Sequence, residues 1–489
     1  MNKNVAIIGS GFAGLSAATC LASKGIDVHV FEKNKQVGGR ARQFETNGFK
    51  FDMGPSWYWM PDVFESYFKL FGRDPKEFYE LKLLDPAFAM IFEDEVMDIP
   101  ADFDSICDLF EQTEKGSADQ LRKFMKDAAY KYEKGINDLV YKPGLSIMEF
   151  ADPKLMFDVF RLQIFSSFSK HVRTHFKHPK LISLMEFPVL FLGAMPEKTP
   201  ALYSLMNYAG LKLGTWYPMG GFHKIIEGMQ QVAEEAGVHF HTNQPVSGFN
   251  IKNNTIDHII AKGHSIDVDA VIGAADYHHV EQSLLEAKYR NYSEGYWDRR
   301  TFAPSCLIYY IGTNKRIPKL RHHNLFFDNN LQQHSEEIYI DKKWPHKPLF
   351  YVCCPSKTDP SVAPDGSENI FLLMPIAPGL EDSEPQREVY YKKMMERLEK
   401  FVGEPVRPNV VYKKSYCVSN FVADYNAYKG NAYGLANTLR QTAILKPSIK
   451  SKKVKNLFYT GQLTVPGPGV PPSLISGQVV AKELMKRFK

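Results

Sequence analysis

A glycine-rich turn near the start of the chain constrains the fold most strongly. A G-x-G-x-x-G motif follows the apolar run Val5–Ile8 and precedes Ala13–Ser23, a run of small residues with helical character. In a strand–turn–helix unit the first glycine permits a tight turn, the second lets the backbone approach a pyrophosphate, and the third lets the helix pack closely on the strand. The helix N-terminus adds free N–H donors and partial positive charge. The motif therefore predicts a dinucleotide site at Gly9, Ser10, Gly11, Phe12, Ala13 and Gly14.

A carboxylate stands where such a site needs one. Glu32 follows the second predicted strand, Asp27–Phe31, and lies 18 residues after Gly14 (32 − 14). A carboxylate at this place accepts hydrogen bonds from an adenosine ribose and repels a 2′-phosphate. Strand, helix and second strand together form a βαβ unit.

Two further glycine motifs favour FAD over NAD. Gly38-Gly39-Arg40-Ala41-Arg42 follows Glu32 within ten residues. Its glycines open the backbone to close approach, and Arg40 or Arg42 can offer a cation to phosphate. Near the other end, a predicted strand over 457–460 leads into a Gly/Pro-rich loop and a helix that starts near Leu474, which supplies another set of N–H donors. We add Gly39, Arg40, Arg42, Gly461, Gly469 and Val470 to the predicted FAD site.

The βαβ signals lie at the start, middle and end of the chain, which predicts an α/β fold. We expect a Rossmann-like FAD-binding domain assembled from three chain segments, with an inserted α+β domain for substrate and membrane. Helical patterns dominate from Asp62 to Gly214, and strand-like runs occupy 300–314, 348–355 and 369–376. The predicted boundaries are 1–75, 216–285 and 441–489 for the FAD-binding segments, 76–215 for a helical insertion and 286–440 for the substrate-domain sheet.

Composition excludes several functions. The chain has 489 residues with 60 Lys+Arg and 55 Asp+Glu, and a net charge of +5 is too small to predict nucleic-acid binding. Six cysteines without a C-x-x-C motif indicate a reducing compartment and no zinc module. We predict no metal site, because the adjacent histidine pairs should point opposite ways in a strand, and the alternating pair has no third histidine or carboxylate nearby in sequence. These pairs are His278-His279, His322-His323 and His239/His241.

Taken in this order, the motifs resemble those of the bacterial-type phytoene desaturases, flavoproteins of the carotenoid pathway within the wider flavin amine oxidase superfamily. The resemblance covers essentially the whole chain. Its specific part is the stretch from Asn456 through Gly461 to Pro466-Gly467-x-Gly469-Val470, which is similar to the signature of carotene desaturases. The resemblance also implies that Val246 contacts adenine through its backbone and that Asp276 lies near the cofactor.

The resemblance implies FAD-dependent desaturation of 15-cis-phytoene towards lycopene, by hydride transfer to flavin and proton loss from the adjacent carbon. Quinone or oxygen would then accept the electrons. Hydride loss beside a polyene leaves a delocalised allylic cation, so no strong base is required and we name no catalytic residue. Glu149 and Asp152 are candidates for negative potential around that cation, although both also fit ordinary helix-end carboxylates.

A C40 hydrocarbon dissolves only in membranes, so we expect a peripheral association of a cytoplasmic protein with the inner face of the cell membrane. No acidic residue lies between Asp158 and Glu186, where apolar and cationic residues alternate. Such a segment fits an interfacial helix on anionic lipid, or equally a core helix followed by a solvated basic face. Its residues are Phe160, Ile164, Phe165, Phe168 and Phe176 with Arg161, Lys170, Arg173, Lys177 and Lys180.

Three other functions stay open from sequence. A desaturase of later intermediates, such as a hydroxycarotenoid 3,4-desaturase, shares the same motifs. A polyene isomerase or cyclase would use flavin without net oxidation. A prenyl-lipid carrier belongs to another class, and the intact Gly9, Gly11, Gly14 and Glu32 argue against it because a carrier does not need a flavin.

Overall fold

The apolar run near the N-terminus forms the central strand of a parallel sheet in a computed structural model that describes residues 3–150, 162–164, 166–438 and 440–488. Val5 and Ile7 face one core and Ala6 and Ile8 face another, so the strand is buried on both sides, as parallel strands usually are. The five strands, in the order β19-β13-β1-β2-β9, are Leu457–Tyr459, Ala270–Gly273, Asn4–Ile8, Asp27–Phe31 and Val238–His241.

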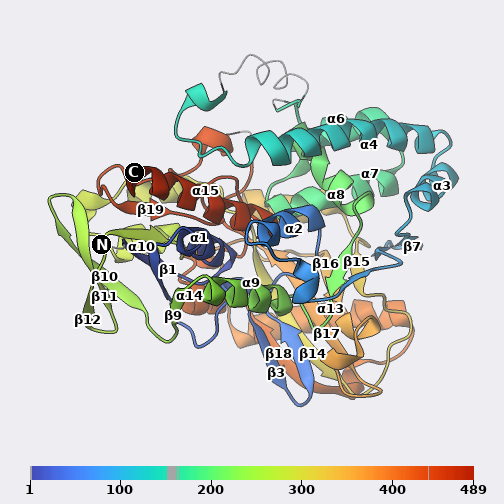
Figure 1. Ribbon diagram of the computed structural model, residues 1–489. Helices are drawn as coiled ribbons and strands as arrows, with labels where there is room; N and C mark the ends of the chain where they lie inside the picture. Colours follow the sequence, from blue (N-terminus) through green and yellow to red (C-terminus); the bar gives the residue numbers. More distant parts are fainter. Residues whose placement is uncertain (1–2, 151–161, 165, 439, 489) are drawn as a thin grey trace.

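This sheet confirms the Rossmann-like domain built from three chain segments, since its strands come from the start, middle and end of the sequence. Three helices cover one face, and a small antiparallel sheet with α10 (Tyr277–Ser283) covers the other (Figure 1). The covering helices are α1 (Phe12–Ala22), α9 (His223–Glu235) and α15 (Val470–Phe488). The small sheet consists of β10 (Val246–Lys252), β11 (Thr255–Ala261) and β12 (His264–Asp267).

A larger, mainly antiparallel sheet forms the second half of the molecule, at the lower right of Figure 1. Its order is β18-β14-β17-β16-β15-β6-β7, and the strands are Val410–Tyr416, Ser305–Thr313, Glu368–Ile376, Phe350–Cys353, His323–Phe326, Phe88–Ile91 and Val96–Ile99. Successive side chains of β14 point to opposite faces of the sheet. Leu307 and Tyr309 pack toward α13 (Glu384–Val402), whereas Cys306 and Ile308 face the core shared with the parallel sheet.

Helices of the predicted insertion lie above the larger sheet (Figure 1). They are α3 (Phe103–Thr113), α4 (Ser117–Lys134), α6 (Phe168–His175), α7 (Pro179–Glu186) and α8 (Leu205–Leu211). The shorter elements are α2 (Pro61–Lys69), α11 (Glu294–Asp298), α12 (Leu331–Glu336), α14 (Val418–Tyr425) and the strand pairs β3 (Gln43–Thr46) with β4 (Phe49–Asp52) and β5 (Leu81–Leu83) with β8 (Trp216–Pro218).

The expectation that helices dominate from Asp62 to Gly214 is wrong for residues 81–99. Strands β6 and β7 form there, and β6 pairs in parallel with β15 to extend the larger sheet. A four-residue apolar run such as Phe88–Ile91 has no periodicity that separates a strand from a buried helical turn. Only its pairing with distant β15 decides the conformation.

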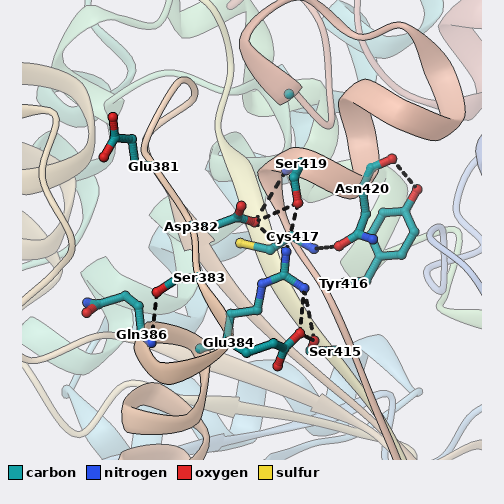
Figure 2. Close-up of polar contacts among 12 residues, drawn as sticks. Glu381, Asp382, Ser383, Glu384, Gln386, Ser415, Tyr416, Cys417, Ser419 and Asn420 are labelled. Carbon is teal, nitrogen blue, oxygen red and sulfur yellow. Dashed lines mark hydrogen bonds and ion pairs between the residues drawn. The ribbon is translucent and has the colours of Figure 1, made fainter.

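A buried network of charged and polar side chains links α13 to β18, the edge strand of the larger sheet. Arg387 donates to Asp382 at 2.6 Å, to Ser415 at 3.0 Å and to Ser419 at 2.9 Å, and its side chain is 8% exposed. Figure 2 shows Asp382 facing Ser419 and Cys417, with Ser415 and Glu384 on the other side of the network. Burial raises the pKa of the Asp382 carboxyl, but the hydrogen bonds from Arg387 and Cys417 outweigh burial, so this pKa lies below its usual value.

Replacing Arg387 by alanine is expected to lower the free energy of unfolding by about 3–5 kcal/mol, because it leaves the Asp382 carboxylate buried without its cation. Lys413→Ala is the control, since its ion pair with Glu388 is exposed and should contribute less than about 1 kcal/mol. Urea unfolding of both variants and the parent measures the difference.

The stability difference between the parent and Arg387→Ala should also depend on pH. The Asp382 carboxylate stabilises the fold at pH values above about 3.9, which is the pKa of an aspartate in the unfolded chain. This stabilisation is lost as the pH falls through the lower pKa that Asp382 has in the folded protein. The difference in free energy of unfolding between the parent and Arg387→Ala should therefore become smaller below about pH 4. A difference in free energy of unfolding that stays constant across this pH range would contradict stabilisation by the Arg387–Asp382 pair.

Candidate functional site

The two glycine-rich turns, more than 400 residues apart in sequence, meet at one end of the parallel sheet. Helices α1 and α15 bring them together by packing against each other. A Cβ atom on Gly477 of α15 would lie 2.3 Å from the Ala13 carbonyl oxygen, so only glycine allows this approach. The Ser476 hydroxyl then accepts from the Gly461 N–H at 3.1 Å, which fixes the second turn beside the first helix.

Each glycine of the first turn has a distinct role. Gly9 has φ of +103°, and an added Cβ would lie 3.0 Å from the Ala275 nitrogen. A Cβ on Gly14 would lie 2.1 Å from the Gly9 carbonyl oxygen, so Gly14 serves the packing of helix on strand. A Cβ on Gly11 would meet no atom within 4 Å, because this residue faces a cavity.

Glu32 is held firmly at the edge of that cavity. One carboxylate oxygen accepts from the Ser10 N–H at 3.1 Å and from its hydroxyl at 2.7 Å. The other accepts from the Asn34 N–H at 2.9 Å. These bonds tie the end of β2 to the first turn and orient the carboxylate before any ligand binds.

The two candidate arginines differ. Arg40 lines the cavity, donates to the Asn431 carbonyl at 3.2 Å and lies over the Tyr425 ring, while its buried Nε has no hydrogen-bond partner among the described residues. Burial lowers the pKa of Arg40, and the charges of Tyr425 and Asp276 only partly oppose this shift. Arg42 instead forms an ion pair with Asp424 at 2.7 Å and does not line the cavity, so the structure does not support it as a phosphate ligand.

The cavity has a volume of about 610 Å³, within the range of ordinary ligand sites. Most of the predicted cofactor residues line it. They are Gly9, Ser10, Gly11, Phe12, Ala13, Glu32, Gly39, Arg40, Val246, Gly461, Gly469 and Val470, together with Asp276. Gly14 and Arg42 do not line it, and the close approach of Gly14 to Gly9 explains its place in the motif.

The rest of the cavity wall is mainly apolar and comes largely from the second half of the molecule. Its residues include Trp57, Trp59, Phe187, Leu190, Cys306, Ile308, Leu325, Phe327, Ile338, Leu349, Tyr351, Leu373 and Tyr433. Two histidines, His279 and His334, also line the cavity. His334 is neutral near pH 7, since burial lowers its pKa to about 4. Both ring nitrogens are already used, because Nδ1 accepts from the Leu349 N–H at 3.1 Å and Nε2 bonds the Pro375 carbonyl at 3.2 Å.

Sequence reasoning missed nearly all of these apolar wall residues. They lie on separate strands and short helices, and each looks like an ordinary core residue in its local sequence. The alternation along β14 was the one available signal, since Cys306 and Ile308 share a face. That pattern does not reveal which face meets a cavity.

The predicted membrane segment is only partly described. Phe160, Phe165, Arg161 and Asp158 lie outside the described residues, as does Asp152. Phe168 and Phe176 are 0% exposed and pack against the helices around α6, so for these two residues the structure favours the core-helix alternative over lipid contact. Arg173 pairs with Glu186, and Lys180 pairs with Asp94 at 2.7 Å.

Glu149 closes a turn and does not face the cavity wall. Its carboxylate accepts from the N–H groups of Gly144, Leu145 and Ser146 at 2.8, 2.9 and 3.1 Å. Glu149 does not line the cavity. The structure therefore favours the ordinary helix-end interpretation for this residue.

Two histidine pairs lie differently from their sequence expectation. The rings of His322 and His323 are 4.5 Å apart, so they do not point in opposite directions. His239 of β9 stacks on His29 of neighbouring β2, and Asp27 lies within 3.8 Å of His239. A third histidine and a carboxylate thus come from another strand, which sequence spacing did not reveal.

Comparison with known proteins agrees with this site. The family model for flavin-containing amine oxidoreductases matches residues 12–485. The chain is 40% identical to a carotenoid 3,4-desaturase from Haloarcula japonica, over 99% of this chain and 98% of the relative. It is 28% identical to a zeta-carotene-forming phytoene desaturase from Myxococcus xanthus, over 99% and 94%. A solved oxidoreductase from Methanosarcina mazei shares the fold, with TM-score 0.62, 17% identity and coverage of 98% and 100%.

Substituting Gly11 by alanine should weaken FAD binding at least tenfold, or about 1.4 kcal/mol, because the new Cβ enters the cavity without disturbing the fold. Gly14→Ala should instead destabilise the chain by about 1–3 kcal/mol or more, since its Cβ overlaps the Gly9 carbonyl. Flavin titration and thermal unfolding separate the two effects. A folded Gly11→Ala protein with parental FAD affinity would show that the backbone at Gly11 does not contact the cofactor.

Proposed function

The chain belongs to the flavin-containing amine oxidoreductase family, and from this premise we propose that it desaturates an acyclic carotene, acting on 15-cis-phytoene towards lycopene. It is an FAD-dependent oxidoreductase that acts on CH–CH groups. One observation carries the substrate proposal. A single cavity has the glycine turns, Glu32 and Arg40 on one part of its wall and aromatic and aliphatic side chains on the rest.

The residues of the first part fit FAD. Gly11 leaves open space where a pyrophosphate would pass, and the N-terminus of α1 directs N–H groups there. Arg40 offers a desolvated guanidinium whose Nε has no hydrogen-bond partner in the described part of the chain, as expected of a cation that awaits a phosphate. In this proposal Glu32 binds the adenosine ribose and Val246 the adenine, while Gly461, Gly469 and Val470 offer backbone groups from the second turn; all five line the cavity.

FAD, when bound, supplies the two-electron acceptor that removal of hydrogen from a C–C single bond requires. The chain's own residues do the remaining work. The apolar wall binds a hydrocarbon by burial alone and keeps water away from a developing cation. Trp57, Tyr351 and Tyr433 present aromatic rings at this wall, whose negative faces stabilise nearby positive charge. We propose quinone or oxygen as the final electron acceptor.

A specific observation favours a second candidate, desaturation at the 3,4 position of a carotenoid. The Haloarcula japonica 3,4-desaturase is more similar to this chain, at 40% identity, than the Myxococcus xanthus phytoene desaturase, at 28%. Such a reaction extends a polyene that is already conjugated, so it needs the same apolar wall. The two candidates differ only in which acyclic carotene enters.

Anaerobic incubation with each substrate separates the candidates. If the protein is a phytoene desaturase, phytoene should bleach the flavin absorbance while coloured polyene appears, and lycopene should not. A 3,4-desaturase should show the reverse, with a red-shifted product from lycopene. The Gly11→Ala protein, at an FAD concentration that fills the parent but only partly fills the variant, serves as the control with reduced flavin content. Bleaching by none of phytoene, lycopene and a hydroxylated acyclic carotene contradicts a desaturase. A product formed while the flavin stays oxidised contradicts it as well and favours an isomerase.

We also propose that the protein binds the inner face of the cell membrane through a surface different from the segment expected from sequence. No helix among the described residues is long and apolar enough to cross a bilayer. Exposed apolar side chains gather instead on two turns that touch, because Gly144 lies against Ala443. These turns are the teal one around 141–148 and the orange-red one around 443–445 at the top of Figure 1. We call this set the apolar rim: Tyr141, Leu145, Met148, Ile444 and Leu445.

The apolar rim fits a bilayer by its exposure and its position. Met148 is 73% exposed and Leu445 49% exposed, and exposed apolar side chains that lie together mark an interaction surface more than single ones do. Gly144 also contacts Val465 of the second glycine loop, so the rim lies beside the segment that bounds the cofactor site. A carotene dissolved in the bilayer would therefore meet the protein close to its reaction site.

Replacing Met148 and Leu445 together by serine should lower partitioning onto anionic phospholipid vesicles by about tenfold or more, because each side chain loses roughly 1.5 kcal/mol of apolar burial. Ile340→Ser is the matched control, since Ile340 is similarly exposed but lies outside the rim. Vesicle co-sedimentation measures the change. Equal loss of binding in the control, or none in the double variant, would contradict the rim as the membrane surface.

A further inference from the structure

Two histidines and a cysteine form a buried cluster outside the main cavity. His323 begins β15 and lies directly opposite Cys353, the last residue of β16, while His322 immediately precedes the strand. Their exposed fractions are 4%, 0% and 1% for His322, His323 and Cys353. One ligand atom of each residue lies within 4.8 Å of the others.

Hydrogen bonds orient both rings and leave one nitrogen of each ring free. His322 Nδ1 bonds the Thr358 hydroxyl at 2.7 Å, and His323 Nδ1 bonds the Tyr351 hydroxyl at 2.6 Å. Each Nε2 is buried without a hydrogen-bond partner among the described residues. An unpaired buried polar atom is unfavourable and calls for a water or an ion as its partner. Histidines that bind metals are typically fixed in this way through the second nitrogen.

A small second cavity adjoins the cluster. It has a volume of about 20 Å³, which is room for one water molecule, and His322 and Cys353 line it. Asp52 also lines it and supplies a nearby carboxylate. Both oxygens of Asp52 already accept backbone N–H groups of His223 and Phe222, at 3.2 and 2.6 Å, so Asp52 can balance charge but is not counted as a ligand.

We propose that His322, His323 and Cys353 bind one Zn²⁺ ion, with a water in the small cavity as the fourth ligand. Two imidazoles and a thiolate form a donor set that zinc prefers, and three protein ligands with one water is a common arrangement. Binding replaces the thiol proton, which is released to solvent. Tetrahedral zinc would draw its ligand atoms to roughly 3.3–3.6 Å from one another, so movements of about 1 Å suffice.

The position of this site indicates a structural role. None of the three ligands lines the main cavity, but His323 stacks on Trp57 at 4.1 Å and bonds Tyr351, and both of these residues do line it. Across the small cavity lie Asp52 and Gly221, which belong to the cofactor-binding half. The ion would therefore hold the paired ends of β15 and β16 together and stiffen the wall behind Trp57 and Tyr351.

Metal content of the full-length protein with FAD tests the proposal. After chelation, equilibration with Zn²⁺ and removal of excess metal, elemental analysis should find about one zinc per chain. Asp27, His29 and His239 form a second group of potential ligands at the surface, so the measurement uses a His239→Ala background. Co²⁺ in place of Zn²⁺ should give a thiolate-to-cobalt absorption band.

Matched variants then assign the site. Cys353→Ser should lose most of the zinc and the cobalt band. Cys354→Ser should keep both, because the Cys354 sulfur faces Glu368 at 3.2 Å and not the histidines. The His239→Ala background protein keeps the whole cluster, so its metal content does not depend on whether a cluster variant folds. Less than about one tenth of an equivalent of zinc in this protein would overturn the proposal and assign the small cavity to water. Zinc bound at full stoichiometry without a thiolate band, or retained in Cys353→Ser, would overturn it as well.

Discussion

Close approach of backbone to backbone at one end of the parallel sheet is the constraint on which the structure depends. Gly14 lets α1 lie against the turn that precedes it, and Gly477 lets α15 lie against α1. Any Cβ at these positions would overlap a carbonyl oxygen, so the approach is possible only for glycine. Because α15 carries the second glycine loop with it, this packing also places Gly461 beside the first turn.

The cavity that results separates charge from apolar surface. Arg40 brings a desolvated cation whose Nε has no hydrogen bond to any residue that the structure describes, whereas Arg42, two residues later, forms an ion pair with Asp424. Glu32 is oriented by Ser10 and Asn34. The rest of the wall comes largely from the larger sheet, where burial of hydrocarbon is the available binding energy. One protein surface thus suits a charged cofactor at one place and a polyene at another.

The larger sheet divides the second half into two regions with different chemistry. One face of β14 packs on α13, whose position depends on the buried pair of Arg387 and Asp382. The opposite face lines the cavity, and β15 and β16 carry the histidine–cysteine cluster behind that lining. The cavity wall is therefore supported from behind by residues that do not themselves line the main cavity.

Much of the cofactor site was predictable because local sequence encodes local backbone. The spacing of Gly9, Gly11 and Gly14 and the distance to Glu32 describe one βαβ unit, and the structure places that unit as expected. The same reasoning could not decide where a residue's partner is distant. Arg40 and Arg42 were equal candidates until the structure placed Asp424 beside Arg42. For Phe168 and Phe176 the sequence left lipid contact and core burial equally open, and the helices around α6 bury both.

The sequence by itself thus determined the class of fold, the FAD cofactor and the carotenoid-desaturase resemblance, since these depend on backbone conformations that short motifs dictate. Only the tertiary structure decided which arginine faces the cavity, that β6 and β7 extend the larger sheet, which apolar residues form the wall, and that His322, His323 and Cys353 converge. Those outcomes depend on pairing between segments far apart in the chain, and the periodicity of a single segment carries no record of its partner.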